Sequence, residues 1–295
     1  MSKCFILALL PGLVLSVPVL AEPPALSPVL PAIPAVARLP ALQPAPAQTP
    51  SPALSPVLSP AAVEAEAARL HGLFLRDVPH SVRPGAAQQH ALVARVWAEI
   101  EAAGQVIDAP QLVVAVDRNP RVQEVAILLA RPAGPWEVIG ATHVSTGQAG
   151  RFDHYITPTG VFLHTDAILD YRAEGTFNEN HIRGYGVKGM RVWDFGWQTA
   201  AKGWRDDRER GPMRLLMHAT DPDVLERRIG RPASQGCVRI PAAMNRFLDR
   251  FGVLDADYER VARDDIRYRA LLLPARTPTP FAGRMMVVID SSEAA

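Results

Sequence analysis

Two residues with complementary chemistry stand near each other in the C-terminal half of this 295-residue chain. Residues 231–240 read Arg-Pro-Ala-Ser-Gln-Gly-Cys-Val-Arg-Ile and contain Cys237, one of two cysteines; the other is Cys4. An apolar run at residues 213–217 ends directly before His218. A histidine can form an ion pair with a cysteine by taking the thiol proton, and the resulting thiolate is a nucleophile. The pair therefore indicates covalent catalysis by a cysteine.

The residues around Cys237 have types that would support such chemistry. Gly236 has no Cβ, so we expect a substrate carbonyl to approach closely and the amides of Gly236 and Cys237 to stabilise an oxyanion. Arg239 carries a fixed charge that can hold a carboxylate by two hydrogen bonds. The structural alternatives are ordinary ones. A lone cysteine is usually a small buried hydrophobe, and a histidine that ends an apolar strand is often a satisfied core residue.

The pattern resembles the signature of the L,D-transpeptidases, the ErfK/YbiS/YkuD family. That signature is a histidine followed by Ser/Thr-His-Gly-Cys, an apolar residue, and Arg or Asn. Here His218 is followed by fifteen residues and then by Ser-Gln-Gly-Cys-Val-Arg at 234–239. A second family landmark is Val-Ser-Thr-Gly at 144–147 and Thr-Pro-Thr-Gly-Val-Phe at 157–162. One position departs from the family, because Gln235 stands where it has a histidine.

The resemblance implies a mainly β fold, a YkuD-like sandwich domain with capping helices. It also implies a peptidoglycan L,D-transpeptidase that forms an acyl-enzyme on stem peptides and passes it to an amine. The acceptor would be a second stem peptide, which gives a 3–3 crosslink, or a wall-anchored lipoprotein. No metal or organic cofactor is implied. The roles carried over are the nucleophile Cys237, the base His218, the helper carbonyl of Ala219, and supporting positions at Ser234, Gln235 and Arg239.

Two other functions stay open on the sequence. Water could replace the acceptor amine, and the protein would then be a carboxypeptidase or amidase on the same substrate. Alternatively, the protein could be a wall-binding relic without turnover, which the departure at Gln235 would explain.

The N-terminal residues 1–21 predict a secretory signal peptide. Lys3 precedes an apolar run at 5–20, and Val-Leu-Ala at 19–21 offers small residues for cleavage. An uncleaved anchor is the alternative, but the run is short for a span and two prolines interrupt it. We therefore expect export to the periplasm or cell envelope of a Gram-negative bacterium. Cleavage would leave Cys237 as the only cysteine.

Residues 22–60 predict a linker. Twelve prolines lie in residues 23–60, and so dense a proline content favours polyproline II over a packed core. The segment could be a passive tether, a spacer that holds a domain away from a membrane, or a docking strip for a partner.

The composition changes at Ala61. Apolar periodicity predicts helices at 61–77 and 86–103, within a helical N-terminal segment at 61–108 that packs on a catalytic domain at 109–295. In that domain we expect strands at 112–116, 122–129, 136–144 and 285–289, and a capping helix at 241–251. The short connections between the first three strands predict antiparallel pairing.

The stretch between the landmarks is harder to assign. Residues 181–190 are glycine-spaced, and residues 191–204 bring together three tryptophans and a phenylalanine. This stretch predicts either a loop packed by its own aromatics or a wall or lid of the substrate cleft. The histidines show no metal-ligand spacing such as His-Glu-x-x-His, which argues against a zinc peptidase. A net charge of +1 without a basic stripe argues against a nucleic-acid partner.

Overall fold

The computed structural model describes residues 59–207 and 209–293, in which two β-sheets are combined with a similar amount of helix. Strands account for 28% and helices for 26% of the described residues, so this part of the chain is sheet-rich and mixed. The predicted signal peptide at 1–21 and almost all of the predicted linker at 22–60 lie outside the described residues. No helix in the described ranges is both long and apolar enough to cross a bilayer.

The larger sheet has the strand order β1-β4-β3-β2-β10-β5. Its antiparallel core is β2, β3 and β4, which confirms the expected pairing of the three strands, whereas β10 lies parallel to β2. The parallel contact arises because β10 arrives from the far end of the chain and not through a short turn. The strands are β1 (Ser81–Val82), β2 (Gln111–Asp117), β3 (Glu124–Ala130), β4 (Glu137–His143), β5 (Gly160–Leu163) and β10 (Met285–Ile289).

The smaller sheet has the order β6-β7-β8-β9. A long antiparallel hairpin joins β7 to β8, and β9 adds to β8 in parallel. These strands are β6 (Tyr171–Arg172), β7 (Arg191–Ala201), β8 (Arg210–Ala219) and β9 (Val238–Ile240).

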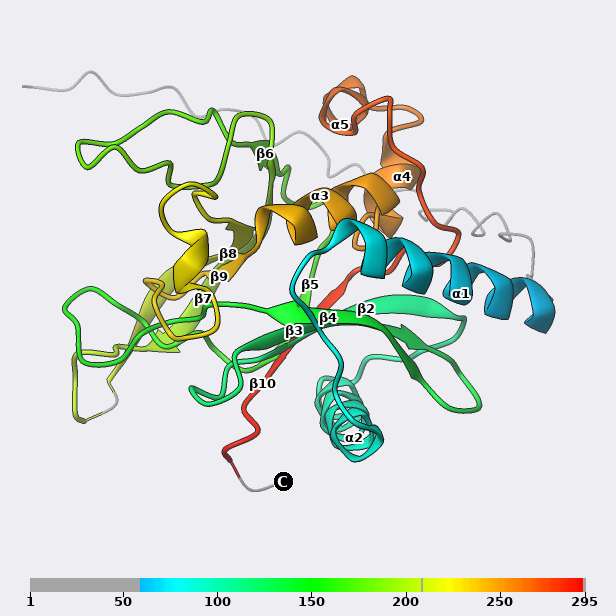
Figure 1. Cartoon of the computed structure of the whole chain (residues 1–295), viewed down its shortest axis with the longest axis horizontal. Helices are drawn as coiled ribbons and strands as arrows, with labels where there is room; N and C mark the ends of the chain where they lie inside the picture. Colours follow the sequence, from blue (N-terminus) through cyan, green and yellow to red (C-terminus); the bar gives the residue numbers. More distant parts are fainter. Residues whose placement is uncertain (1–58, 208, 294–295) are drawn as a thin grey trace, which may run out of the picture. The chain divides into compact units, whose positions relative to one another are not determined.

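Two N-terminal helices cover opposite faces of the larger sheet (Figure 1). Helix α1 (Pro60–Asp77) buries Leu70 and Phe74 against one face, and α2 (Ala86–Ala102) buries Val96 and Ile100 against the other. The approach of α1 is close, since a Cβ at Gly140 would lie 2.2 Å from the Phe74 ring. Both helices belong to the same compact unit as the sheets, as the sequence predicts.

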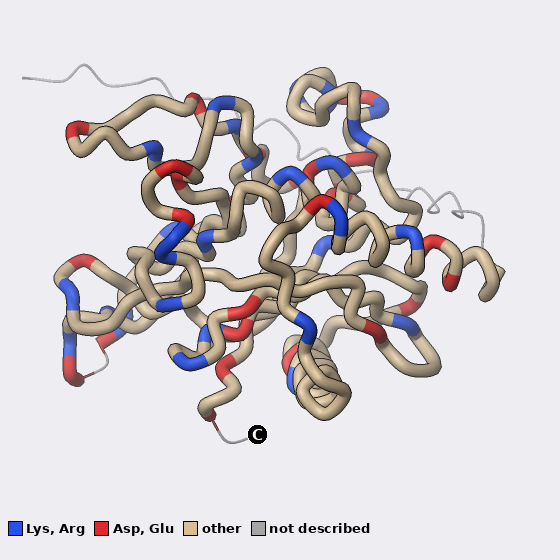
Figure 2. The backbone as a smooth tube through the Cα atoms, viewed as in Figure 1, with Lys and Arg blue, Asp and Glu red and all other residues tan. Residues whose placement is uncertain are grey.

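Three α-helices follow the last strand of the smaller sheet along the chain, and one 3₁₀ turn precedes that strand. Helix α3 follows β9 directly and ends at Gly252, whose φ of 61° is the left-handed conformation typical of a helix C-terminus. Charged residues concentrate on helices and loops, while the middle of the larger sheet is almost free of them (Figure 2). These elements are α3 (Ala242–Phe251), α4 (Ala256–Val261), α5 (Ile266–Leu271) and the 3₁₀ turn η1 (Glu226–Arg228).

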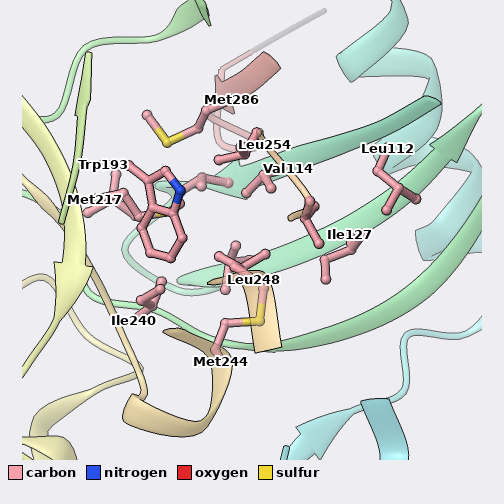
Figure 3. Close-up of a cluster of buried hydrophobic side chains, with 14 of the residues drawn as sticks. Leu112, Val114, Ile127, Trp193, Met217, Ile240, Met244, Leu248, Leu254 and Met286 are labelled. Carbon is pink, nitrogen blue, oxygen red and sulfur yellow. The ribbon is translucent and has the colours of Figure 1, made fainter. Parts of the chain in front are cut away.

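One hydrophobic core joins the two sheets. Figure 3 shows Trp193, Met217 and Ile240 of the smaller sheet facing Val114 and Ile127 of the larger one. Helix α3 contributes further side chains to the same cluster. The odd-numbered residues of β8 and the even-numbered residues of β9 therefore point inward, which decides what the other face of the smaller sheet can present.

The aromatic stretch at 191–204 is not a loop. Most of it is β7, and Trp193 and Phe195 are buried in the core. A β-bulge interrupts the alternation of inward and outward side chains that would have predicted this strand. At the bulge, Gly196 has a φ of 77°, and the register shifts between Asp194 and Trp197. The prediction of a self-packed loop or lid is thus wrong for most of this stretch, although Trp197 is exposed and Trp204 lies in the turn that follows.

A buried ionic cluster ties the smaller sheet to its neighbours. The Arg191 Nε lies 2.8 Å from Asp170 Oδ2, and its Nη2 lies 3.1 Å from Asp255 Oδ1. His164 donates from Nε2 to Asp170 at 2.9 Å and from Nδ1 to the Leu254 carbonyl at 2.8 Å. Burial lowers the pKa of His164, but the Asp170 carboxylate outweighs it and raises that pKa above its usual value. The cluster therefore holds an imidazolium and is saturated with partners.

Candidate active site

Strand pairing brings Cys237 and His218 to neighbouring positions of the smaller sheet. His218 of β8 pairs with Arg239 of β9, and Met217 pairs with Val238. Cys237 directly precedes Val238, so it lies one register step before the ladder. With strands about 4.8 Å apart and a rise of about 3.3 Å per residue, the Cys237 and His218 Cα atoms are roughly 8 Å apart.

Both side chains point away from the hydrophobic core. Met217, Val238 and Ile240 are core residues, and side chains alternate along a strand, so His218 and Cys237 occupy the opposite face. This shared face is what nucleophile and base require. The alternation also places Arg239 on that face.

His218 is buried, and its tautomer is fixed. Its Nδ1 lies 2.7 Å from the Ala219 carbonyl oxygen, the helper carbonyl that the resemblance implies. A carbonyl can only accept, so Nδ1 carries the proton and Nε2 keeps its lone pair as a base. The Tyr185 ring contacts the imidazole edge to face, with centroids 4.8 Å apart and planes at 83°.

Cys237 is partly exposed, with its thiol against the edge of β8. Its Sγ lies 3.8 Å from the Arg214 carbonyl oxygen. Burial raises the pKa of the Cys237 thiol, while the Leu216 backbone and the Arg239 charge lower it without cancelling the effect. Burial, together with a smaller contribution from the Arg239 charge, lowers the pKa of His218 to about 4, although the hydrogen bond to the Ala219 carbonyl opposes this shift.

These two directions argue against a resting ion pair between Cys237 and His218. A thiol with a raised pKa and an imidazole with a lowered pKa both stay neutral near pH 7. The site therefore holds a neutral thiol and a neutral imidazole on one face of the smaller sheet. Any nucleophilic attack by Cys237 would have to be accompanied by loss of the thiol proton to a base.

The turn before Cys237 is held by Ser234, which is fully buried. Its hydroxyl accepts from the Gly236 N–H at 3.0 Å and donates to the Cys237 carbonyl at 2.6 Å. The Gly236 amide is thus already occupied, which differs from the expectation that it would bind an oxyanion. Of the two backbone amides expected to bind an oxyanion, the Cys237 N–H is the one that does not donate to the Ser234 hydroxyl.

The reason for glycine at 236 also differs from the one inferred from sequence. A Cβ at Gly236 would lie 2.8 Å from the Met213 side chain and 3.2 Å from the Cβ of Tyr155. Its φ of 126° is a conformation that side chains disfavour. Packing against Met213 and backbone geometry therefore require this glycine.

The two upstream landmarks converge on the nucleophile turn. Ser145 pairs with Arg239, and Gly147 pairs with Ser234, each as an isolated bridge. The buried Thr157 hydroxyl donates to the Gly236 carbonyl at 2.7 Å and accepts from the Gly147 N–H at 2.8 Å. Segments far apart in the sequence thus fix the backbone that carries Cys237.

Gln235 is exposed, and its backbone carbonyl accepts from the Tyr155 N–H at 3.2 Å. A buried histidine lies beside the same turn: the Nδ1 of His154 is 2.9 Å from the Ser234 carbonyl oxygen. Sequence reasoning gave no role to His154, because its spacing fits no motif. Its contribution is to orient the backbone next to Gln235.

Arg239 is only partly accessible. Its Nη1 donates to the Ala233 carbonyl at 3.1 Å, and its buried Nε has no hydrogen-bond partner among the described residues. Burial lowers the pKa of Arg239, and the nearby Cys237 opposes that effect. The Arg239 guanidinium therefore contributes a positive charge near the Cys237 thiol. Because it is only partly accessible, it is a limited candidate for binding a carboxylate.

Several residues near the site were missed by sequence reasoning. Tyr171 and Tyr185 lie with ring centroids 5.9 Å apart, and burial followed by the Tyr185 phenol raises the pKa of Tyr171. Asp194 forms an ion pair with Arg214 at 2.8 Å on the face that carries His218. The register of β7 on β8 brings the two side chains together, and no local sequence motif predicts this ion pair.

Within residues 59–207 and 209–293, no group of three or more His, Cys, Asp or Glu side chains is arranged to hold a metal ion. Neither a protein-family model nor a curated protein matches the chain. Assignment of the site therefore depends on its chemistry and on the resemblance of its motifs.

Proposed function

We propose that this protein is a cysteine-dependent acyltransferase of the L,D-transpeptidase type, with a domain of the YkuD-like fold, acting on peptidoglycan stem peptides in the cell envelope. The observation that carries the proposal is the pairing of β8 with β9. It sets a tautomer-fixed base, His218, and a partly exposed thiol, Cys237, on one face. Two landmarks that resemble the family also meet at this thiol.

In the proposed acylation, the Cys237 sulfur attacks the carbonyl of the L-residue that precedes a terminal D-alanine. His218 Nε2 takes the thiol proton as the C–S bond forms. The Cys237 N–H stabilises the tetrahedral oxyanion. Collapse breaks the C–N bond, and D-alanine leaves with the proton that His218 returns.

In the proposed deacylation, an amine of a second stem peptide or of a wall-anchored protein attacks the thioester. His218 takes a proton from the attacking amine as the C–N bond forms. The C–S bond then breaks, and His218 passes the proton to the departing Cys237 sulfur, so the thiol and the neutral imidazole are both regenerated. The neutral resting pair suits this cycle, because the imidazole must be unprotonated to accept a proton in both halves.

Mass spectrometry of the intact protein after incubation with a tetrapeptide stem tests the proposal. We expect an adduct at Cys237 equal to the tripeptide acyl group, and no adduct in Cys237→Ser. Muropeptide products then separate the acceptors: dimers indicate transfer, whereas trimmed monomers indicate the carboxypeptidase alternative. A protein that binds stem peptide but never forms the adduct would be the non-catalytic relic, and the proposal would be wrong.

A further inference from the structure

A groove with two tryptophans lies between helix α2 and the turn that joins β3 to β4. It encloses about 530 Å³, and Trp97 of α2 and Trp136 of the turn both line it. The two ring centroids are 5.3 Å apart, with the ring planes at 67°. Trp97 is 37% exposed, so an apolar ring faces solvent here. This tryptophan groove is completed by Val93, Ala94, Pro132 and Pro135, among others.

The two indoles differ in their hydrogen bonds. Trp136 donates its N–H to the Arg131 carbonyl at 3.0 Å, which fixes its ring on the turn, whereas the Trp97 N–H donates to no described residue. A tryptophan with an exposed ring and a free N–H can bind a peptide, because the ring buries apolar groups and the N–H pairs with a backbone carbonyl.

The groove carries little uncompensated charge. Arg131, which lines it, lies 2.9 Å from the Glu64 carboxylate and 3.3 Å from that of Glu137. Its Nη1 also donates to the Pro135 carbonyl at 2.7 Å. Aromatic walls of this kind bind proline-rich peptides in the polyproline II conformation, which is preformed and therefore loses little entropy on binding. The groove thus suits an uncharged, proline-rich peptide.

A peptide of this kind precedes α1 in the chain. Residues 23–58 are rich in proline, contain Arg38 as their single charged residue, and end directly before Ser59, the N-cap of α1. Glu64, the partner of Arg131, lies about 7.5 Å along the helix from this N-cap. Ten residues of polyproline II span roughly 31 Å, so the segment is long enough to return from Ser59 to the groove.

We infer that the tryptophan groove is the docking site of this chain's own proline-rich segment, residues 23–58. In the proposed complex, proline rings and Leu or Val side chains pack on the two indoles, and a carbonyl of the segment accepts from Trp97. The hexapeptide Ala-Leu-Ser-Pro-Val-Leu, present at 25–30 and at 53–58, supplies two copies of such a motif. Docking shortens the reach of the segment as a tether, and it does not depend on chemistry at Cys237.

Photo-crosslinking in the full chain tests the docking. The photoreactive residue p-benzoylphenylalanine replaces Leu26 or Leu54, one in each hexapeptide copy, and crosslinked peptides are mapped by mass spectrometry. We expect crosslinks within one chain to residues 89–97 and 131–137. Crosslinks that avoid both ranges overturn the inference. Groove crosslinks found only in a covalent dimer also overturn it, because the occupant is then the segment of a second copy.

Variants of the groove distinguish docking from chance contact. Trp97→Ala should lower the crosslink yield about tenfold, since a buried tryptophan is a typical binding hot spot. Ala94→Glu keeps both indoles and places a charge at an exposed position of the groove, so it should have a similar effect. Ala91→Glu is the matched control at an exposed position of α2 outside the groove. Wild-type yields in both groove variants overturn the inference.

Nuclear magnetic resonance of the five tryptophan indole N–H groups gives a measurement without a crosslinker. The native chain is compared with one in which a Gly-Ser sequence of equal length replaces residues 23–58, and Trp97→Phe assigns the Trp97 signal. We expect the Trp97 signal to differ between the two chains and that of Trp193, buried in the core, to stay in place. An unchanged Trp97 signal shows that the groove does not hold the segment.

Discussion

Two clusters of buried polar side chains lie in this protein, and they use their hydrogen bonds differently. In the ionic cluster, both ring nitrogens of His164 are occupied, and Arg191 reaches three carboxylates. In the candidate active site, the imidazole of His218 has a partner only at Nδ1, and the buried Nε of Arg239 has none among the described residues. The first cluster therefore stabilises the fold, whereas the second retains free hydrogen-bonding groups for a further partner.

The two histidines illustrate the difference. The Asp170 carboxylate raises the pKa of His164 above its ordinary value despite burial. No carboxylate contacts His218 among the described residues, so burial lowers its pKa to about 4. One imidazole is thereby held charged and the other neutral, as expected if His164 stabilises the fold and His218 acts as the proposed general base.

Removing the His218 base should give the largest effect on activity. We expect His218→Ala to lower the rate of acyl-enzyme formation by roughly 10²–10⁴-fold while leaving the fold intact. His143→Ala, at an exposed histidine, serves as the control. Acylation is followed by mass spectrometry of samples quenched at successive times. If His218→Ala acylates at the wild-type rate, His218 is not the base.

The pH dependence sharpens the same point. A base with a pKa near 4 is already neutral at pH 5, so kcat/KM should stay level toward acid and fall only as pH drops through about 4. Because the pKa of Cys237 is raised, its alkylation by iodoacetamide should be slow at pH 7 and accelerate above pH 9. Rapid, pH-independent alkylation near neutrality would instead indicate a resting ion pair.

Breaking the ionic cluster should destabilise the fold strongly. We expect His164→Ala to lower the free energy of unfolding by about 3–5 kcal/mol, since it leaves buried charge without a partner. His90→Ala, at an exposed histidine of α2, should have little effect.

The sign of its pH dependence follows from the two pKa directions. The raised pKa of His164 stabilises the fold fully below its unfolded value of about 6.5, and this stabilisation is lost as pH rises through the folded pKa. The lowered pKa of Asp170 stabilises the fold above about pH 4, and this is lost in stronger acid. Denaturant titrations at several pH values should therefore show a wild-type advantage over His164→Ala that shrinks toward alkaline pH.

A smaller effect is expected at the positioning residue Thr157. Thr157→Val keeps the shape but removes both hydrogen bonds of the hydroxyl, and we expect about 1–3 kcal/mol of destabilisation with a lower kcat. Thr157→Ser should restore both properties. Thr159→Val changes the same motif at a half-buried position and is the control. A loss of stability without any change in kcat would show that the hydroxyl does not position Cys237.

The smallest effect is expected at Gln235. Its side chain is exposed, so Gln235→His should change kcat/KM by less than about tenfold, or about 1.4 kcal/mol. The measurement is the same acylation assay. If Gln235→His activates an otherwise silent protein, the relic interpretation is correct and the native chain lacks the proposed activity.

The sequence alone determined the elements with clear periodicity. The strands at 112–116 and 285–289 and the helices at 61–77, 86–103 and 241–251 all lie at the predicted places within a residue or two. Their apolar patterns are local, so they can be recognised without knowing the partner. The nearness of Cys237 and His218 also followed from sequence, through spacing and resemblance.

Tertiary structure decided the properties that depend on contacts between distant segments. The strand β7 was missed because the bulge at Gly196 breaks its alternation, and only pairing with β8 reveals it. The protonation states of His218 and His164 depend on burial and on whether a carboxylate lies beside the ring. The occupation of the Gly236 amide by Ser234 depends on the shape of one turn. Residue types fix which charges are possible, but solvent exclusion and neighbouring dipoles decide which of them exist.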